Sequence, residues 1–166
     1  MSRIWKFGDD IDTDQIVPGR YAPYMTGDSQ VSKYAFVEHR PDFAPNVKPG
    51  DVIVTGKNFG CGSSREYAAV ALRQCSPACI IAGSYARIFF RNCINLGIRL
   101  YEAPDDVRAQ LEDGAEVIYN PETDQLVSNG KVINLKPMPE FVHQIVAEGG
   151  ILEYVRKHGR FPGEEA

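Results

Sequence analysis

The sequence predicts an α/β fold, with a mixed β-sheet built around a central strand–helix–strand–helix–strand segment. Two observations predict it. A β-branched run at residues 52–55 leads through a glycine-rich loop into a helical stretch, and the same order of strand and helix repeats before a third strand at 98–101. Farther along, Asn129-Gly130 lies between two strand-like runs and is a strong signal for an antiparallel hairpin. The chain therefore combines parallel crossovers with antiparallel strands.

The N-terminal part contains one strand and little other regular structure. Residues 2–7 alternate polar and apolar side chains, as a half-buried strand does. Residues 8–21 are dominated by turn residues and are predicted to form a loop. Residues 21–47 are irregular, with room for a short helix near 31–39, and residues 48–51 form a turn.

The central segment carries the parallel crossovers. Its predicted elements are strand 52–55, helix 67–73, strand 78–82, helix 85–95 and strand 98–101. Ser63-Ser64-Arg65-Glu66 matches a capping box, with Ser63 or Ser64 as N-cap and Glu66 reaching back. Gly97 is a natural stop for the second helix. Strands joined in this way form right-handed crossovers in a partly parallel sheet.

The C-terminal part changes from antiparallel strands to helices. The predicted elements are strands 115–119, 125–128 and 131–135 and helical stretches 139–148 and 151–158. Asn129-Gly130 joins the last two strands. Gly149-Gly150 separates the helical stretches, which form either two short helices or one broken helix.

Composition and charge place the chain among ordinary globular proteins. Its 166 residues and 18.4 kDa suit a single domain over residues 1–166. A net charge of −4 without a basic patch argues against nucleic-acid binding. No apolar run reaches the ~20 residues of a membrane span, and no signal-peptide pattern opens the sequence, so we expect a cytoplasmic protein.

The four cysteines are expected to be reduced in that compartment. No pair has the Cys-x2-Cys spacing of simple zinc and iron–sulfur sites, so we expect this chain to bind no metal by itself. Cys75, Cys79 and Cys93 are predicted to be small core residues. Cys61 lies near a helix start, where a thiolate is favoured, but no histidine offers it a local partner, which argues against a cysteine hydrolase.

The loop Gly60-Cys61-Gly62-Ser63-Ser64-Arg65 is the strongest candidate site. Its glycines let the backbone approach a ligand closely, and the helix start behind them offers unpaired N–H groups. Arg65 adds a fork of donors that matches a carboxylate. A serine there would accept a proton where surrounding donors stabilise its alkoxide. The loop indicates either an anion site or, with equal weight, an ordinary capped turn.

A second candidate is the acidic stretch 9–14, which has four aspartates in six positions. Such a cluster suits a hard cation such as calcium or magnesium, but the glycine and glutamate of an EF-hand loop are absent. We therefore favour aspartates that cap turns and orient other groups over a metal site.

Four segments of the chain, taken in order, carry a resemblance to a known family: residues 6–18, 58–66, 84–92 and 147–152. They resemble the small subunits of 3-isopropylmalate dehydratase and homoaconitase, in the aconitase superfamily, and most of all the short archaeal-type small subunits. Several motifs that match in the same order over nearly the whole chain are far more specific than any one of them.

The resemblance implies a fold, a partner and a reaction. The fold would be the swivelling β/β/α domain that forms the fourth domain of aconitase. The partner would be a separate large subunit whose own cysteines hold a [4Fe-4S] cluster, with iron as the Lewis acid for the leaving hydroxyl. The reaction would be dehydration and rehydration of a small hydroxy di- or tricarboxylate, a hydro-lyase activity that requires the large subunit.

The resemblance also assigns site residues by position. Ser63 matches a serine that acts as the general base, and Arg65 matches an arginine that binds a substrate carboxylate. Ser64, between them, is expected to contact substrate, and Asp14 matches an aspartate of the wider active site. These types agree with the chemistry, because removing a C–H proton beside a carboxylate needs a base and a cation.

Substrate choice in this family depends on the loop after the Pro-x-Arg-Tyr segment. Here that loop reads Tyr21-Ala22-Pro23-Tyr24-Met25-Thr26. It differs from the aliphatic loops of isopropylmalate enzymes and from the arginine-bearing loop of homoaconitase. Its uncharged, largely apolar character suits an alkyl substituent better than a third carboxylate, whose burial without a cation is costly. Arg20 weakens the case for an alkyl substrate, because its guanidinium would bind a further carboxylate if the side chain turned inwards.

We therefore predict a 3-isopropylmalate dehydratase small subunit, which would convert 2-isopropylmalate to 3-isopropylmalate in leucine biosynthesis. Homoaconitase and 2,3-dimethylmalate dehydratase are alternatives within the same class. A non-catalytic module that binds a carboxylate through residues 60–65 is the alternative from another class. Co-purification with an iron–sulfur partner separates the two classes.

Overall fold

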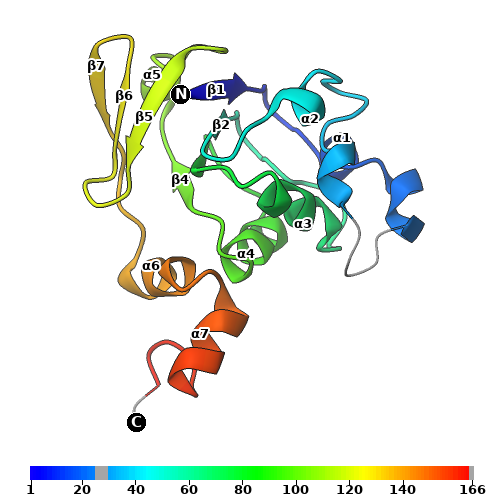
Figure 1. The fold of residues 1–166 in the computed structure, drawn as a ribbon, viewed down its shortest axis with the longest axis vertical. Helices are drawn as coiled ribbons and strands as arrows, with labels where there is room; N and C mark the ends of the chain where they lie inside the picture. The colour runs from blue at the N-terminus through cyan, green and yellow to red at the C-terminus, as the bar shows by residue number, and fades with distance from the viewer. Residues whose placement is uncertain (25–29, 165–166) are drawn as a thin grey trace.

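The computed structural model describes residues 1–24 and 30–164, with residues 22–24 described by their backbone alone. Its framework is a seven-stranded sheet with the order β4-β3-β2-β1-β5-β6-β7 (Figure 1). The strands are β1 (Ser2–Lys6), β2 (Val52–Val54), β3 (Cys79–Ala82), β4 (Leu100–Glu102), β5 (Glu116–Asn120), β6 (Gln125–Ser128) and β7 (Lys131–Asn134). Neighbours from β4 to β1 are parallel and those from β1 to β7 antiparallel. The mixed sheet is confirmed, with its parallel strands on one side.

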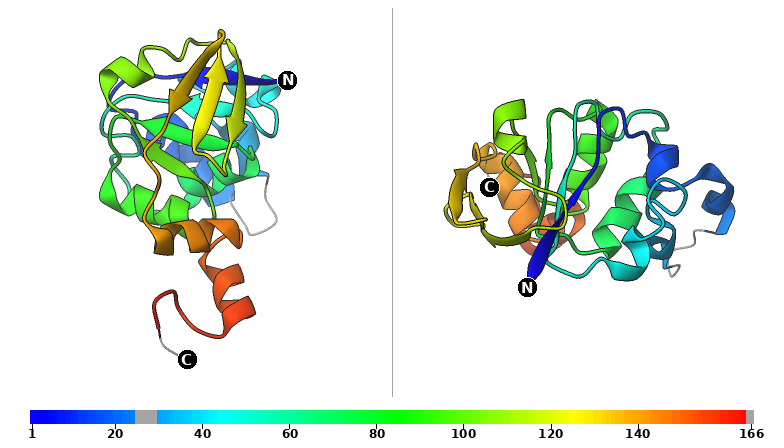
Figure 2. Two further views of the ribbon diagram at one scale, coloured as in Figure 1. Left: turned by 90° about the vertical axis from the view of Figure 1, so that its left-hand side faces the viewer. Right: turned by 90° about the horizontal axis from the view of Figure 1, so that it is seen from above.

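Most helices pack on one face of the parallel strands. The helices are α1 (Thr13–Ile16), η1 (Gly19–Tyr24), η2 (Val31–Tyr34), α2 (Phe43–Asn46), α3 (Tyr67–Gln74), α4 (Arg87–Asn95), α5 (Asp105–Arg108), α6 (Glu140–Ala147) and α7 (Ile151–His158), where η marks a 3₁₀-helix. Figure 1 shows α6 and α7 at the lower end, and Figure 2 shows α7 projecting beyond the rest. No helix in residues 1–24 and 30–164 is long and apolar enough to cross a membrane.

Both faces of the parallel strands are buried. Successive residues of a strand point to opposite faces, so neighbouring residues belong to different cores. Trp5, Ile53 and Ile80 belong to the core shared with the helices. Ile4 and Val52 belong to a second core, which includes side chains from β5, β6 and β7. Burial on both faces explains why β2 is a continuous β-branched run with no alternation.

The predicted loop at residues 8–21 is wrong in part, because it contains α1 and the start of η1. A capping box stabilises α1. The Asp12 side chain accepts a hydrogen bond from the Gln15 N–H (2.7 Å), and the Gln15 side chain accepts one from the Asp12 N–H (2.9 Å). Residue types that favour turns also cap helices, so the composition of residues 8–21 did not distinguish a loop from a short capped helix.

Other differences from the predicted elements have local causes. α2 and α5 have four residues each, too few to show a helical period in the sequence. α4 begins two residues after the predicted start at Tyr85. Tyr85 forms a β-bridge with Phe59, and its hydroxyl lies 2.9 Å from the carbonyl oxygens of Ile80 and Tyr101. These tertiary contacts hold Tyr85 outside the helix.

Glycines decide two of the connections. Asn129 and Gly130 both have positive φ (50° and 73°), as the predicted hairpin turn requires. Gly149 and Gly150 separate α6 from α7, as predicted. A Cβ on Gly150 would lie 2.5 Å from the carbonyl oxygen of Asn95, so glycine lets this joint pack against the end of α4.

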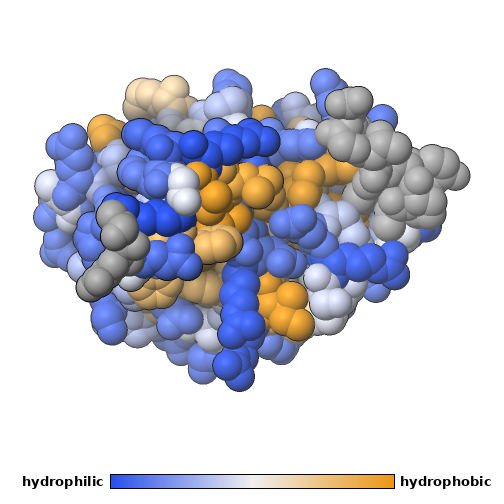
Figure 3. Space-filling view, turned by 90° about the horizontal axis from the view of Figure 1, so that it is seen from below, coloured by the Kyte–Doolittle hydropathy of each residue, from blue (hydrophilic) through white to orange (hydrophobic). Residues whose placement is uncertain are grey.

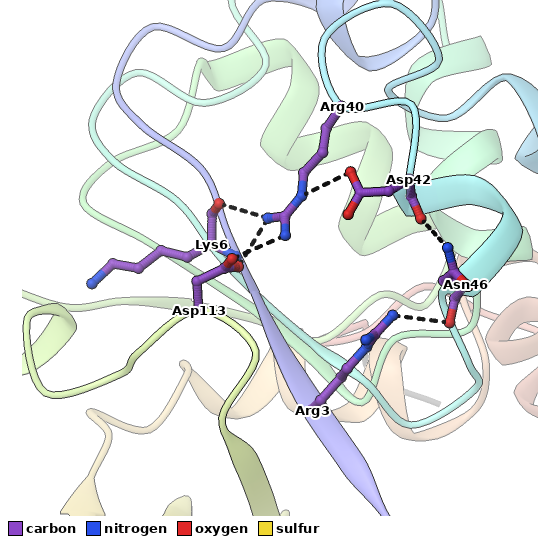
Figure 4. A network of polar contacts seen from close by, with 6 residues as sticks. All are labelled: Arg3, Lys6, Arg40, Asp42, Asn46 and Asp113. Atoms are coloured by element: carbon purple, nitrogen blue, oxygen red, sulfur yellow. Dashed lines mark hydrogen bonds and ion pairs between the residues drawn. The ribbon is translucent and has the colours of Figure 1, made fainter.

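A polar network links the strand β1 to the segments before α2 and β5 (Figure 4). Arg40 donates to both carboxylate oxygens of Asp113 (2.9 and 3.0 Å) and to the Lys6 carbonyl (3.1 Å), and it pairs with Asp42 (3.4 Å). Burial raises the pKa of Asp113, but the hydrogen bonds from Arg40 and from the Lys6 N–H outweigh it and hold that pKa below its ordinary value.

Replacing Asp51 with alanine is expected to destabilise the protein by about 3–5 kcal/mol. The buried Asp51 carboxylate accepts from the Arg3 N–H (3.0 Å), the Trp5 Nε1–H (2.9 Å) and the Lys48 N–H (2.9 Å). Alanine would leave these donors without an acceptor. Urea unfolding followed by the fluorescence of Trp5, the single tryptophan, measures the change.

The matched control for Asp51→Ala is Asp106→Ala. Asp106 is exposed in the first turn of α5, and its removal should change stability by no more than about 0.5 kcal/mol. A loss below about 1 kcal/mol for Asp51→Ala would contradict the role given to its hydrogen bonds.

The lower end of the molecule has a mixed surface. Figure 3 shows hydrophobic side chains gathered near the centre of this face, with hydrophilic side chains around them. Large hydrophobic side chains of the helices that are at least half exposed are Ile88, Phe141 and Leu152. This end therefore differs from an all-polar surface.

Candidate functional site

The serine loop, residues 60–65, lies against the start of α1. The Thr13 N–H donates to the Cys61 carbonyl (2.8 Å), and the Ser63 N–H donates to the Thr13 side-chain oxygen (3.0 Å). Thr13 is buried, so both bonds are shielded from water. Asp14 is the next residue of α1 and is exposed. The structure thus brings together two regions that the resemblance assigned to one site.

The predicted capping box at Ser63–Glu66 is wrong. α3 begins at Tyr67 with Glu66 as N-cap, and that cap has no side-chain hydrogen bond. The Ser63 hydroxyl instead accepts from the Arg65 N–H (3.2 Å). A serine that bonds the backbone two residues on favours a turn over a helix. The serine loop therefore precedes the helix, and its serine hydroxyls do not cap it.

A cavity of about 520 Å³ opens beside Ser63. Its lining comes from the serine loop and from the first turns of α4: Gly60, Gly62, Ser63, Ala86, Arg87, Ile88, Phe89 and Arg91. Arg87 and Arg91 were not predicted as site residues. The sequence signal was present, because both lie in residues 84–92, one of the segments that carry the family resemblance.

Packing between the serine loop and α4 sets the shape of this cavity. Gly60 has a φ of +83°, and a Cβ built on it would lie 2.1 Å from Cγ of Phe89. The Ala86 N–H donates to the Phe59 carbonyl (3.0 Å), and Phe59 and Phe89 pack edge to face at 5.2 Å. Glycine at position 60 is therefore required for α4 to approach the loop this closely.

Ser64 and Arg65 are exposed at the outer edge of the serine loop. The Ser64 carbonyl accepts from the Asn92 side chain (3.4 Å), which ties it to α4. The Arg65 guanidinium lies 5.8 Å from the ring of Tyr67 and has no ion pair within the described part of the chain. Its donors are therefore available to an anion.

Arg20, proposed from the sequence as a further substrate contact, lies on the surface with two partners. It forms an ion pair with Glu38 and donates to the Tyr21 hydroxyl (3.0 Å). The hydrogen bond with Tyr21 and the charge of Glu38 raise its pKa above the ordinary value. Tyr21 in turn stacks on Tyr34 with ring centroids 4.2 Å apart. The positive charge of Arg20 is therefore already matched by a carboxylate.

The rest of the predicted specificity loop is only partly described. Ala22, Pro23 and Tyr24 are in η1, but their side chains lie outside the described part of the structure. Met25 and Thr26 lie outside the described residues altogether. The apolar wall predicted from these residues stays a prediction.

The aspartates of residues 9–14 cap and orient neighbouring groups, as favoured from the sequence. Asp9 accepts from the Lys57 N–H (2.7 Å), Asp10 accepts from the Asn58 side chain (3.2 Å), and Asp12 caps α1. Among residues 1–24 and 30–164, no group of three or more His, Cys, Asp or Glu side chains is placed to hold a metal ion.

Cys61 is not the activated thiol that a neighbouring helix start would produce. Partial burial, with the charges of Asp12 and Asp10, raises the pKa of its thiol above the ordinary value. The helix that follows it in the chain, α3, begins only at Tyr67, so the dipole of α3 does not act on this thiol. Cys75, Cys79 and Cys93 are buried, which confirms them as core residues.

Comparison with known proteins identifies the family. Residues 12–101 match the model of the aconitase C-terminal domain, and this stretch includes the serine loop, α1 and α4. The chain belongs to the aconitase C-terminal domain family. The resemblance predicted from the four sequence segments is thereby confirmed.

Relatives from several organisms match this family member over nearly its full length. The homoaconitase small subunit of Thermus thermophilus is 52% identical, with 99% of this chain and 100% of that protein covered. The 3-isopropylmalate dehydratase small subunit 1 of Deinococcus radiodurans is 49% identical, with 99% and 92% covered.

A solved structure supports the same family assignment. The crystal structure of 3-isopropylmalate dehydratase from Methanocaldococcus jannaschii superposes with a TM-score of 0.86 at 38% sequence identity, and the match covers 95% of this chain and 93% of that one. The predicted fold, the swivelling domain of the aconitase superfamily, is confirmed by this match.

Proposed function

We propose that this chain is the small subunit of a 3-isopropylmalate dehydratase, active as a hydro-lyase only together with a large subunit that carries a [4Fe-4S] cluster. The observation that carries the proposal is the placement of Ser63 on a cavity wall within one short loop of Arg65. This arrangement supplies a proton acceptor and a cation, and no group of three or more His, Cys, Asp or Glu side chains in residues 1–24 and 30–164 is placed to hold a metal ion. The arrangement is suited to one half of an active site.

Ser63 is the group proposed to remove the proton beside a substrate carboxylate. Its Oγ accepts from the Arg65 N–H, and this bond strengthens as negative charge develops on the oxygen. The guanidinium of Arg65 would bind the adjacent carboxylate and stabilise the charge that builds up when the C–H bond breaks. Asp14, held next to Thr13, is proposed to belong to the wider site.

The cysteines of this chain do not suit the cluster, which needs several thiolates close together. Cys75, Cys79 and Cys93 are buried among apolar side chains, and burial raises the pKa of each, to about 12 for Cys75. Cys61 is the one half-exposed cysteine, and its pKa is also raised. The proposal therefore assigns the cluster ligands to the large subunit.

An alkyl substrate is supported by the sequence of residues 21–26 and by the surroundings of Arg20. The loop carries no charged side chain. The guanidinium of Arg20 is paired with Glu38, so binding a third carboxylate would require it to leave that partner. An isopropyl group carries no charge and leaves the Arg20–Glu38 pair intact, and an apolar wall favours its burial.

Homoaconitase is the second candidate, on the strength of the Thermus thermophilus relative with its 52% identity. The two candidates share the proton transfer at Ser63 and differ in the substituent that the specificity loop must accept. They are therefore separated by substrate preference alone.

The test is reconstitution of the chain with its large subunit, purified without oxygen, and assay on 2-isopropylmalate, 2,3-dimethylmalate and homocitrate. We expect kcat/KM to be at least about 100-fold higher for 2-isopropylmalate than for homocitrate, because burying an unpaired carboxylate costs several kcal/mol. The chain without its partner is the control and should be inactive.

Each other result has a definite meaning. A preference for homocitrate would make the protein a homoaconitase subunit. Activity on 2,3-dimethylmalate alone would assign it to that dehydratase. Failure to bind any cluster-bearing subunit would leave the non-catalytic carboxylate-binding module as the answer.

A further inference from the structure

We propose that Arg87 and Arg91 form a second carboxylate clamp, which binds the carboxylate of the substrate that Arg65 does not hold. This inference rests on the proposed function and extends it to two residues that were not predicted as site residues. The observation behind it is that both arginines line the same cavity as Ser63.

The two arginines are neighbours on one side of α4. Residues four apart in a helix lie one above the other, so their guanidinium groups can reach a single ligand. Both side chains are exposed, and neither forms a hydrogen bond or ion pair with any described residue. Arg20, Arg40 and Arg108, in contrast, all have carboxylate partners.

The placement of these arginines is electrostatically unfavourable in the protein alone. Arg87 is the first residue of α4, where the helix dipole is positive and an acidic residue would be stabilising. α4 has no acidic residue in its first turn, and its N-cap, Ala86, forms no side-chain cap. Like charges at positions i and i+4 repel as well. A bound anion would relieve all three effects.

The helix that carries the clamp is anchored to the serine loop. Phe89 lies between the two arginines in sequence, is buried, and packs directly against the Gly60 backbone. One turn further, the Asn92 side chain donates to the Ser64 carbonyl (3.4 Å). α4 therefore cannot slide along the serine loop without breaking these contacts, which fixes the backbone of Arg87 and of Arg91 relative to the proposed base.

A hydroxy dicarboxylate is the anion that fits best. Ser63 and Gly62 share the cavity with the arginines, so an anion there lies beside the proposed base. Ile88, half exposed between them on the same wall, offers apolar contact to a carbon skeleton. An acidic side chain of the large subunit is the competing occupant, and the experiment below distinguishes it.

The experiment compares Arg87→Gln, Arg91→Gln and the double variant in the reconstituted enzyme. We expect KM for 2-isopropylmalate to rise about 10- to 100-fold for each single change, because each removes a charge-assisted bond, while the Kd for the large subunit stays within twofold. Arg73→Gln is the matched control. Arg73 is exposed in the last turn of α3 and does not line the cavity.

Substrate analogues then assign the clamp to one carboxylate. The two isomeric monoamides of 2-isopropylmalate each lack one negative charge. For the isomer whose amide replaces the clamped carboxylate, KM or the competitive inhibition constant should be the same for the unsubstituted enzyme and both variants. For the other isomer, the variants should remain about 10- to 100-fold weaker.

The outcomes separate this inference from the proposed function. An active enzyme whose KM is unchanged by both substitutions would refute the clamp and leave the proposed function intact. A rise in the Kd for the large subunit with KM unchanged would also refute it, in favour of an acidic partner side chain. Inactivity of the unsubstituted pair on every hydroxy acid tested would refute the proposed function and the clamp together.

Discussion

Replacement of Ser63 by alanine is expected to lower kcat of the reconstituted two-subunit enzyme by about 10²- to 10⁴-fold, the usual contribution of a positioned general base. KM should change little, because the hydroxyl is proposed to act on the reacting proton and the arginines to hold the carboxylates. The fold should be almost unaffected. The Ser63 hydroxyl accepts one hydrogen bond, and the bond that anchors the loop is made by its backbone N–H.

Two measurements distinguish a loss of the base from a loss of structure. Thermal unfolding should show Ser63→Ala within about 0.5 kcal/mol of the unsubstituted protein. Ser32→Ala, a serine of η2 away from the cavity lining, should leave kcat unchanged. Retention of kcat within twofold in Ser63→Ala, with the large subunit bound, would show that another group removes the proton.

Replacement of Gly60 by alanine is expected to destabilise the protein by about 2–5 kcal/mol. Two costs add. An alanine at a φ of +83° pays about 1–2 kcal/mol for the left-handed backbone. Its Cβ would also lie 2.1 Å from Cγ and 2.6 Å from Cβ of Phe89, and forcing that packing apart costs about 1–3 kcal/mol.

The chain offers controls that separate the two costs. Gly114 has a similar φ of +78° with nothing within 4 Å of an added Cβ, so Gly114→Ala should pay the backbone cost alone. Gly8 has neither constraint, and Gly8→Ala should be close to neutral. Urea unfolding of all three variants gives the comparison. Equal losses for positions 60 and 114 would show that contact with Phe89 is unimportant.

Gly60→Ala is also expected to affect the site. If Phe89 moves to make room, the first turns of α4 move with it, and so do the guanidinium groups of Arg87 and Arg91. KM of the folded variant should therefore rise as in the arginine variants. A small displacement of a binding group is enough for a large loss.

Local patterns were sufficient for the regular elements of the centre and the hairpin. β2 and α3 agree with the predicted ranges 52–55 and 67–73 to within one residue, because a β-branched run and a helical period are properties of neighbouring residues. The turn at Asn129-Gly130 has the same origin, since both residues accept positive φ.

Predictions from local patterns were wrong where turns and helix caps contain the same residue types. Ser63-Ser64-Arg65-Glu66 has the composition of a capping box, yet the Ser63 N–H is bound to Thr13, fifty residues earlier in the chain. Asp12 lies in a stretch that reads as a loop, yet it caps α1. In both cases the choice between turn and cap depends on a hydrogen-bond partner.

For the site itself, the sequence predicted the serine loop either as an anion site or, with equal weight, as a capped turn, and the family resemblance assigned expected roles to Ser63 and Arg65. Tertiary structure alone showed which other charges face Ser63. Arg87 and Arg91 reach the cavity because the crossover from β3 sets α4 beside the loop and because Phe89 packs on Gly60. The spacing of apolar residues along a segment predicts the secondary structure of that segment. Close packing between segments far apart in the chain depends on the whole fold.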